Sequence, residues 1–337
     1  MKSCAKKDMG RVLKVWSEDY RVIGPARQTQ GDCIFDDFDE ATFTMDYGKP
    51  SLPPKGSLFP NSEITFTVSE GEYHENTERE KVLLFGIRAC DMMGIRQAAN
   101  FMARGFDDPF YRARCENVLT VVMACKGPQN ETCFCTTMRS GPWAEKGFDL
   151  QIFDMGDVYL VEAGSERGEM LMIERFFTEA TSDDGERLAS LKRESAAKVA
   201  DVPAVRTAME RLAAGDVDDA VWDYFGGKCI VCGGCAFVCP TCTCFTVYDV
   251  VRGPREGERV RAWDACLFAG FTREASGHNP RSSQGLRLKR RHGHKLLDYN
   301  AADIQEAVSG CVGCGRCSDY CPVHIGTLEV VKAIAAW

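Results

Sequence analysis

The sequence predicts two structural units: an α/β domain with a mixed or parallel sheet, and a mainly helical, cysteine-rich domain after it. Three observations lead to this prediction. Apolar strands alternate with a helical segment over residues 81–124, which is typical of βαβ units. Residues 166–215 are highly charged and helical in composition, and two matched cysteine runs follow them. We therefore place the α/β domain at 1–165, a helical connector at 166–215 and the cysteine-rich domain at 216–337.

The elements of the first domain follow from the spacing of its apolar residues. The segment KVLLFGI (81–87) is predicted to be a buried strand that leads into a helix, and NVLTVVMA (117–124) is predicted to be the next strand. The segment DLQIFDMGDVYLVEA (149–163) is expected to form a hairpin that extends this sheet, and EITFTV (63–68) is expected to join it. Buried strands joined through a helix make the sheet at least partly parallel.

Composition excludes several classes of protein. With 337 residues, of which 45% are hydrophobic and 27% charged, the chain has the size and polarity of a two-domain globular protein. Its net charge of −8 argues against nonspecific binding to nucleic acid or to an anionic membrane. The first residues lack the apolar segment of a secretory signal, and no apolar run is long enough to span a membrane. We therefore expect a cytoplasmic protein whose 18 cysteines bind metal rather than form disulfides.

Two cysteine runs share one spacing, Cys-x2-Cys-x2-Cys-x3-Cys-Pro. The first lies in KCIVCGGCAFVCPTCTCF (228–245), the second in CVGCGRCSDYCP (311–322), and an insertion at about 245–305 separates them. Such runs hold [4Fe–4S] clusters in two-cluster ferredoxins, where the fourth cysteine ligates the other cluster. Two zinc sites are the alternative, but they normally use C-x2-C pairs without the third cysteine. The ferredoxin-like pattern assigns Cys229, Cys232, Cys235 and Cys321 to cluster 1, and Cys311, Cys314, Cys317 and Cys239 to cluster 2.

A third group of thiols is expected at one edge of the predicted sheet. One cysteine follows each of the two buried strands, and the motif CFC comes shortly after the second strand. Because the carboxyl ends of parallel strands meet at one edge, these thiols can hold a third [4Fe–4S] cluster or zinc, or they can be metal-free buried thiols. Arg88 and Asp91 are expected to cap the helix or orient the thiols, with Asp91 as an alternative ligand. The four cysteines are Cys90, Cys125, Cys133 and Cys135.

Three further cysteines and a basic run have several interpretations. Cys242 and Cys244 either pack beside the first cluster, serve it as an alternative ligand, or perform sulfur chemistry as a dithiol or as part of a noncubane cluster. Cys266 lies in the insertion and can approach or ligate a cluster. The run LRLKRRHGHK (286–295) either stabilises anionic clusters, docks an acidic partner or forms a solvated helix face. No G-x-G-x-x-G or P-loop is present, so no flavin or nucleotide site is expected. Nucleic-acid binding is not expected either.

The chain contains the motifs YRVIGPA, LPPK, LFP, FGIRACDMMGI, CFCTTM, CPTCTCF, RAWDACLFAGFTREASGHNPR, HK (294–295) and CVGCGRC. Together these motifs resemble one family. It comprises the dicluster iron–sulfur subunit of anaerobic sulfite reductase, the β subunit of cytoplasmic NiFe hydrogenases (sulfhydrogenases), and related subunits of heterodisulfide-reductase-linked flavin oxidoreductases. The resemblance implies a non-catalytic electron-transfer subunit between a partner that binds FAD and NAD(P) and a catalytic partner of sulfite reductase, NiFe hydrogenase or heterodisulfide reductase type. The alternative is a cluster-dependent reductase that acts on a sulfur or disulfide substrate at Cys242 and Cys244.

Overall fold

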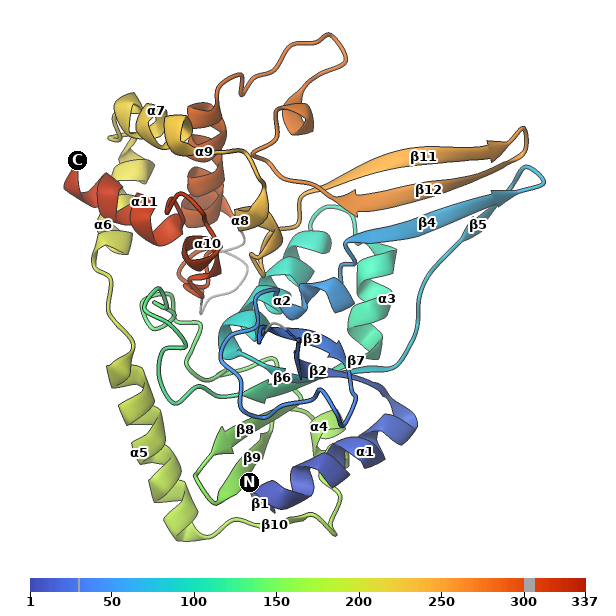
Figure 1. Cartoon of the computed structure of the whole chain (residues 1–337), viewed down its shortest axis with the longest axis vertical. Helices are drawn as coiled ribbons and strands as arrows, with labels where there is room; N and C mark the ends of the chain where they lie inside the picture. Colours follow the sequence, from blue (N-terminus) through green and yellow to red (C-terminus); the bar gives the residue numbers. More distant parts are fainter. Residues whose placement is uncertain (30, 300–306) are drawn as a thin grey trace.

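The first half of the chain is built around a mixed eight-stranded sheet (Figure 1). The computed structural model describes residues 1–29, 31–299 and 307–337. Four strands, β2, β6, β7 and β8, run parallel to one another, and the others pair antiparallel. The predicted mixed sheet, its two buried strands and its hairpin are therefore confirmed. In spatial order the strands are β10 (Phe177–Glu179), β1 (Lys2–Ala5), β9 (Val158–Ala163), β8 (Leu150–Asp154), β7 (Val118–Met123), β6 (Val82–Ile87), β2 (Arg21–Arg27) and β3 (Cys33–Asp37).

Helices cover both faces of this sheet, because its central strands are apolar on both sides. Every residue of β6 and β7 is buried. Leu83 and Phe85 pack toward helix α1 (Met9–Asp19), whereas the neighbouring Leu84 packs toward α2 (Ala89–Met102). This alternation follows the two-residue period of a strand. A further helix, α3 (Pro109–Asn117), leads into β7. Because α2 begins two residues after β6 ends, it leaves the sheet at the edge formed by the carboxyl end of β6.

A second sheet joins the two halves of the chain, and it corrects one prediction. The segment expected to extend the main sheet, β4 (Ser62–Ser69), pairs instead with β12 (Glu256–Trp263) from the insertion. The reason is a buried ion pair: the Arg261 Nη2 lies 2.6 Å from the Glu63 carboxylate, and both side chains are buried. The two hairpins project side by side from the molecule (Figure 1). The outer strands are β5 (Glu72–Glu75) and β11 (Phe245–Gly253).

The rest of the chain is helical or irregular. The connector is helical as expected, except where β10 interrupts it. This short strand pairs with β1 and forms the outermost strand of the main sheet. The prediction of a mainly helical C-terminal domain is not confirmed, since long turns around the cysteines and the β11–β12 hairpin take up much of it. No helix in the described ranges is long and apolar enough to cross a membrane. The helices are α4 (Glu166–Leu171), α5 (Ser182–Lys198), α6 (Ala204–Ala214), α7 (Asp219–Lys228), α8 (Gly234–Phe237), α9 (Gln284–Gly293), α10 (Arg316–Asp319) and α11 (Thr327–Ala336).

Candidate metal centres

The four cysteines predicted for cluster 1 line one cavity. Two of them come from the turn between α7 and α8 and one from α8 itself, while the fourth lies beyond α10, far along the chain. The backbone N–H of Ile325 donates to the Sγ of Cys321 at 3.4 Å, and the Gln284 amide donates to the Sγ of Cys229 at 3.2 Å. Hydrogen bonds to ligand sulfurs stabilise thiolates and tune a cluster. The cavity is thus suited in donor set and hydrogen bonding to a [4Fe–4S] cluster, with Cys229, Cys232, Cys235 and Cys321 as its thiols.

The four cysteines predicted for cluster 2 also approach one another. The Cys311 thiol is buried, which raises its pKa, and the nearby thiols of the other three members raise it further. Burial raises the pKa of Cys314 to about 11, whereas Arg316 and Lys49 act in the opposite direction. Metal binding removes the thiol protons outright, and these cations then face negative charge. The set is Cys239, Cys311, Cys314 and Cys317.

The two runs have the same local backbone. Gly233 precedes α8 with φ +72°, and Gly315 precedes α10 with φ +75°. A Cβ at Gly233 would lie 2.5 Å from the Phe268 ring, and one at Gly315 would lie 2.1 Å from the Thr132 hydroxyl. Both the left-handed conformation and the close contacts therefore require glycine. The repeated spacing in the sequence corresponds to a repeated turn in the structure.

The third group of thiols lies where it was predicted, at the carboxyl ends of β6 and β7. Cys90 is the second residue of α2, and Cys125 lies two residues beyond the end of β7. The Cys135 thiol has a pKa raised to about 12 by burial and by the nearby thiols of Cys125 and Cys133. Within the described residues, no three His, Cys, Asp or Glu side chains are grouped to hold a single metal ion. A cubane spreads its thiolates around a larger core, so the gathering of four thiols remains suited to a cluster.

Sequence reasoning did not predict that the third group borders the second set. The backbone N–H of Phe134 donates to the Gly313 carbonyl at 2.9 Å, and the Cys133 Sγ lies 3.9 Å from the Cys314 carbonyl oxygen. A Cβ at Gly313 would lie 2.6 Å from the Phe134 carbonyl oxygen. The CFC loop of the first domain is therefore packed directly on the second cysteine run.

Asp91 has a structural role that excludes it as the alternative ligand. Its carboxylate caps α2 by accepting the Arg88 N–H at 3.4 Å, as expected. Both of its oxygens also accept hydrogen bonds from Arg316, at 2.6 and 3.0 Å, and both side chains are fully buried. Arg316 lies between two cysteines of the second set. The pair therefore joins the thiol-bearing edge of the first domain to the second cysteine run.

Buried cations near the cysteines were only partly predicted. In the basic run, Arg287 and Arg291 are buried, so a purely solvated helix face is wrong. Lys55, from the LPPK motif, was missed: its Nζ donates to the Ala236 and Cys242 carbonyls at 3.2 and 3.1 Å. It also lies 4.1 Å from the centre of the Trp263 ring. Nothing in the spacing around this lysine distinguishes it from a surface residue.

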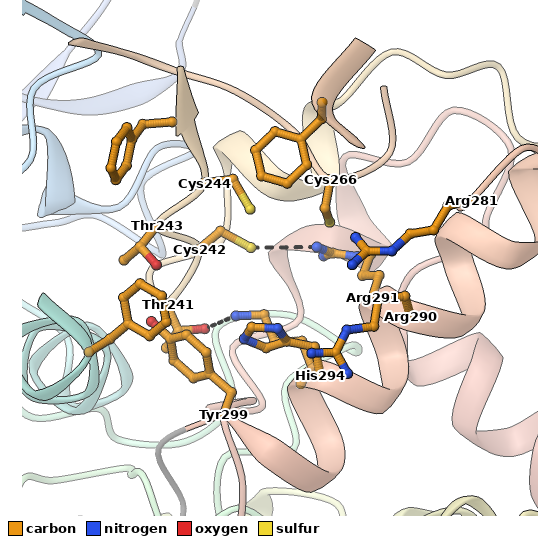
Figure 2. A pocket seen from close by; sticks show the side chains of 14 residues that line it. Thr241, Cys242, Thr243, Cys244, Cys266, Arg281, Arg290, Arg291, His294 and Tyr299 are labelled. Carbon is orange, nitrogen blue, oxygen red and sulfur yellow. Dashed lines mark hydrogen bonds between the residues drawn. The ribbon is translucent and has the colours of Figure 1, made fainter. Parts of the chain in front are cut away.

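The remaining cysteines lie around a second cavity, of about 350 Å³ (Figure 2). The Cys242 Sγ accepts a hydrogen bond from the Arg291 guanidinium at 3.5 Å, and Cys244 and Cys266 also line this cavity (Figure 2). Arg291 lines this cavity and also that of the first cysteine set. Cys266 thus approaches Cys244 and the cations rather than completing either predicted ligand set.

Comparison with known proteins defines the class of this protein. Residues 228–325 match the family described as "4Fe-4S dicluster domain", and this range contains both cysteine runs. The chain is an iron–sulfur protein of the electron-transfer class. It is 29% identical over 321 residues to sulfhydrogenase 2 subunit beta of Pyrococcus furiosus, covering 93% of this chain and 92% of the relative. The similarity to this beta subunit thus extends along nearly the whole chain, whereas the dicluster family matches only its cysteine-rich part. No solved structure matches it significantly.

Proposed function

We propose that the chain relays single electrons through a row of three [4Fe–4S] clusters. The observation that carries the proposal is the adjacency of the three thiol sets. Cys235 of the first set interacts electrostatically with Cys317 of the second, and Cys314 of the second set does so with Cys90 of the third. The ligand sets are those of the sequence prediction, with Cys90, Cys125, Cys133 and Cys135 for the third cluster.

The first set supplies a surface end for this relay. Cys232 is exposed, and beside it Ile230 is 59% exposed although its side chain is apolar. Tyr320, next to the fourth cysteine of the set, is 47% exposed. Exposed apolar side chains around a cluster are suited to contact a redox partner. We propose docking here in the cytoplasm within a multi-subunit complex, as the name of the Pyrococcus relative indicates for that protein.

The proposed partners are of two kinds. One subunit carries FAD and binds NAD(P), and the other is a catalytic subunit of sulfite reductase, NiFe hydrogenase or heterodisulfide reductase type. The residues of this chain would hold and insulate the clusters, and the clusters themselves would supply the one-electron chemistry. Buried cations such as Arg291 and Arg316 would offset the negative charge of cluster and thiolates. The chain's own side chains perform no bond chemistry in this proposal.

Iron and acid-labile sulfide analysis of anaerobically purified protein tests the relay. Three cubanes give about twelve iron atoms per chain, and two give about eight. Cys135→Ser is expected to remove about four iron atoms and the EPR signal of one cluster, whereas the matched control Cys33→Ser keeps the full content. An iron content of about eight in the unchanged protein refutes the third cluster. A content below that refutes the relay.

A second candidate function is supported by the 350 Å³ cavity. Cys242 and Cys244 both line it, and Arg291 and Lys295 bring positive charge beside them. This arrangement favours the alternative of a cluster-dependent reductase of a sulfur or disulfide substrate. The isolated chain, supplied with a reducing dye, would then turn over polysulfide or a small disulfide. If the isolated chain turns over neither sulfite, polysulfide nor disulfides, the reductase function is refuted and the electron relay is the function that remains.

A further inference from the structure

The cavity that Cys242, Cys244 and Cys266 line is cationic. Arg281, Arg290, Arg291 and Lys295 all contribute to its wall, and none of the described residues that line it is acidic. Two of these cations, Arg291 and Lys295, are buried at 4% and 5% exposure. The positive charge is therefore held in a poorly solvated space, where it acts strongly on an entering anion.

The fold places two of the three thiols together at the open end of a hairpin. Cys244 immediately precedes β11, and Cys266 follows β12 by three residues. The Asp264 N–H donates to the Cys244 carbonyl at 3.0 Å, which holds the two chain segments side by side. Both thiols line the cavity, and Figure 2 shows both sulfurs at its wall.

Cys242 is a different kind of thiol. Its backbone N–H donates to the carbonyl of Cys239, one of the predicted ligands of cluster 2, at 3.4 Å, and its Sγ accepts from Arg291. It therefore belongs to the surroundings of the cluster. Cys244 and Cys266 remain as the two other thiols that line the cavity.

We propose that Cys244 and Cys266 form a redox-active dithiol that reduces small anionic disulfides admitted to the cationic cavity. This inference deepens the second candidate function and replaces Cys242 by Cys266 in the reacting pair. The substrate class follows from the cavity: its cations select negative charge, and two thiols on neighbouring segments at one cavity wall can exchange with an S–S bond. Phe245 and Phe271 add apolar wall for the carbon skeleton of the disulfide.

The chemistry balances in two steps. The Cys266 thiolate attacks one sulfur of R–S–S–R, which forms a mixed disulfide and releases one thiolate RS⁻. The Cys244 thiolate then attacks the Cys266 sulfur, which releases the second RS⁻ and leaves a Cys244–Cys266 disulfide. Two electrons and two protons return the pair to the dithiol, and two reduced [4Fe–4S] clusters bound as proposed above would supply one electron each. Arg291, which lines both this cavity and that of the first cysteine set, lies between the pair and the source of electrons.

Electrostatics assign the first attack to Cys266. Its pKa is lowered to about 6 by the neighbouring Cys244 thiol and by the nearby cations Arg291 and Lys295. The pKa of Cys244 is raised for the complementary reason. A thiolate is the nucleophile in thiol–disulfide exchange, so one partner is ready to attack while the other keeps its proton.

The experiment uses the anaerobic cluster-loaded protein without reductant and three disulfides that differ in charge. They are 3,3′-dithiodipropionate (anionic), 2-hydroxyethyl disulfide (neutral) and cystamine (cationic). Differential alkylation and mass spectrometry follow the peptides that contain Cys244 and Cys266, with Cys33 as an internal reference. We expect a Cys244–Cys266 disulfide that forms fastest with the anion, by about tenfold over the cation after normalisation to Cys33. Arg281→Gln is expected to reduce this preference.

Two cysteine variants make the test decisive. Cys244→Ser is expected to accumulate a mixed disulfide at Cys266, whereas Cys266→Ser forms neither product quickly. Cys33→Ser should behave as the unchanged protein, and visible absorption of the clusters verifies folding in each case. The proposal is overturned if Cys244 and Cys266 stay reduced while Cys33 reacts. It is also overturned if the three disulfides react with the pair in the same order of rates as with Cys33. Thiol–disulfide exchange needs no electrons from the clusters. Failure of exchange in protein with full iron content therefore overturns this proposal and leaves the relay intact. A low iron content together with normal exchange refutes the relay alone.

Discussion

Breaking the ion pair between Asp91 and Arg316 is expected to destabilise the protein strongly. Both side chains are fully buried, and two hydrogen bonds of 2.6 and 3.0 Å join them. In Asp91→Asn the amide oxygen still accepts the Arg88 N–H, so the helix cap is retained. The guanidinium of Arg316 keeps its hydrogen bonds to the Pro50 carbonyl at 2.9 Å and to that amide oxygen, but it loses the shorter bond from Nη1. Its buried charge then lacks its carboxylate partner.

The magnitude follows from the burial. Removing one partner of a buried ion pair costs about 3–5 kcal/mol. With an unfolding entropy of about 2.1 cal/mol/K per residue, the 337 residues give about 0.7 kcal/mol/K, so Tm is expected to fall by about 4–7 °C. The surface pair Lys14–Glu40, whose side chains are 71% and 68% exposed, serves as a control. Glu40→Gln is expected to change Tm by less than about 1 °C.

Anaerobic thermal unfolding followed by far-ultraviolet circular dichroism, at one scan rate, measures both variants. Visible absorption recorded in the same scan reports loss of the clusters, which is expected to coincide with unfolding at the second set. The double variant Asp91→Asn with Arg316→Gln should lose less than the sum of the single losses, because the two side chains interact. A Tm for Asp91→Asn within the range of the Glu40→Gln control would refute the reasoning.

Two further predictions concern a glycine and a histidine. Gly315→Ala places a Cβ 2.1 Å from the Thr132 hydroxyl at φ +75°. We expect this variant to lose about 1–3 kcal/mol of unfolding free energy, measured by thermal unfolding. The control Gly227→Ala, in α7 with open space around it, should be neutral or slightly stabilising. Burial and the adjacent Arg291 lower the pKa of His292 to about 3, so only the unfolded chain takes up this proton as pH falls below about 6.5. Lowering the pH from about 7.5 to about 5.5 therefore lowers the free energy of unfolding by about 1.4 kcal/mol, which corresponds to about 2 °C in Tm. His292→Gln should lose correspondingly less stability over that interval. An equal dependence of Tm on pH in the two proteins would contradict this prediction.

Periodicity and spacing predicted the parts of the fold that local sequence determines. β6 and β7 are continuous apolar runs because they are buried on both faces. Their parallel pairing then brings Cys90 and Cys125 to one edge. The cysteine spacings likewise predicted the gathering of Cys229 with Cys321 in one cavity. In each case the signal lies within a few residues of the feature.

Features that depend on distant pairs were not predictable in this way. β4 joins β12 because Glu63 and Arg261, 198 residues apart, form a buried ion pair. Neither residue is unusual in its local sequence. Cys266 reaches Cys244 only because β11 and β12 pair along their whole length. The spacing of its neighbours carries no sign of this approach.

The two cysteine runs share a spacing but differ in what their intervening residues contact. In the second run, the carbonyls of Val312 and Gly313 accept hydrogen bonds from Ser140 and Phe134 of the first domain, and Arg316 pairs with Asp91. In the first run, Ile230 lies 59% exposed to solvent. Because ligand spacing is identical, this asymmetry must come from the intervening residues. It favours a relay whose second cluster is enclosed between the domains and whose first cluster exchanges electrons at the surface.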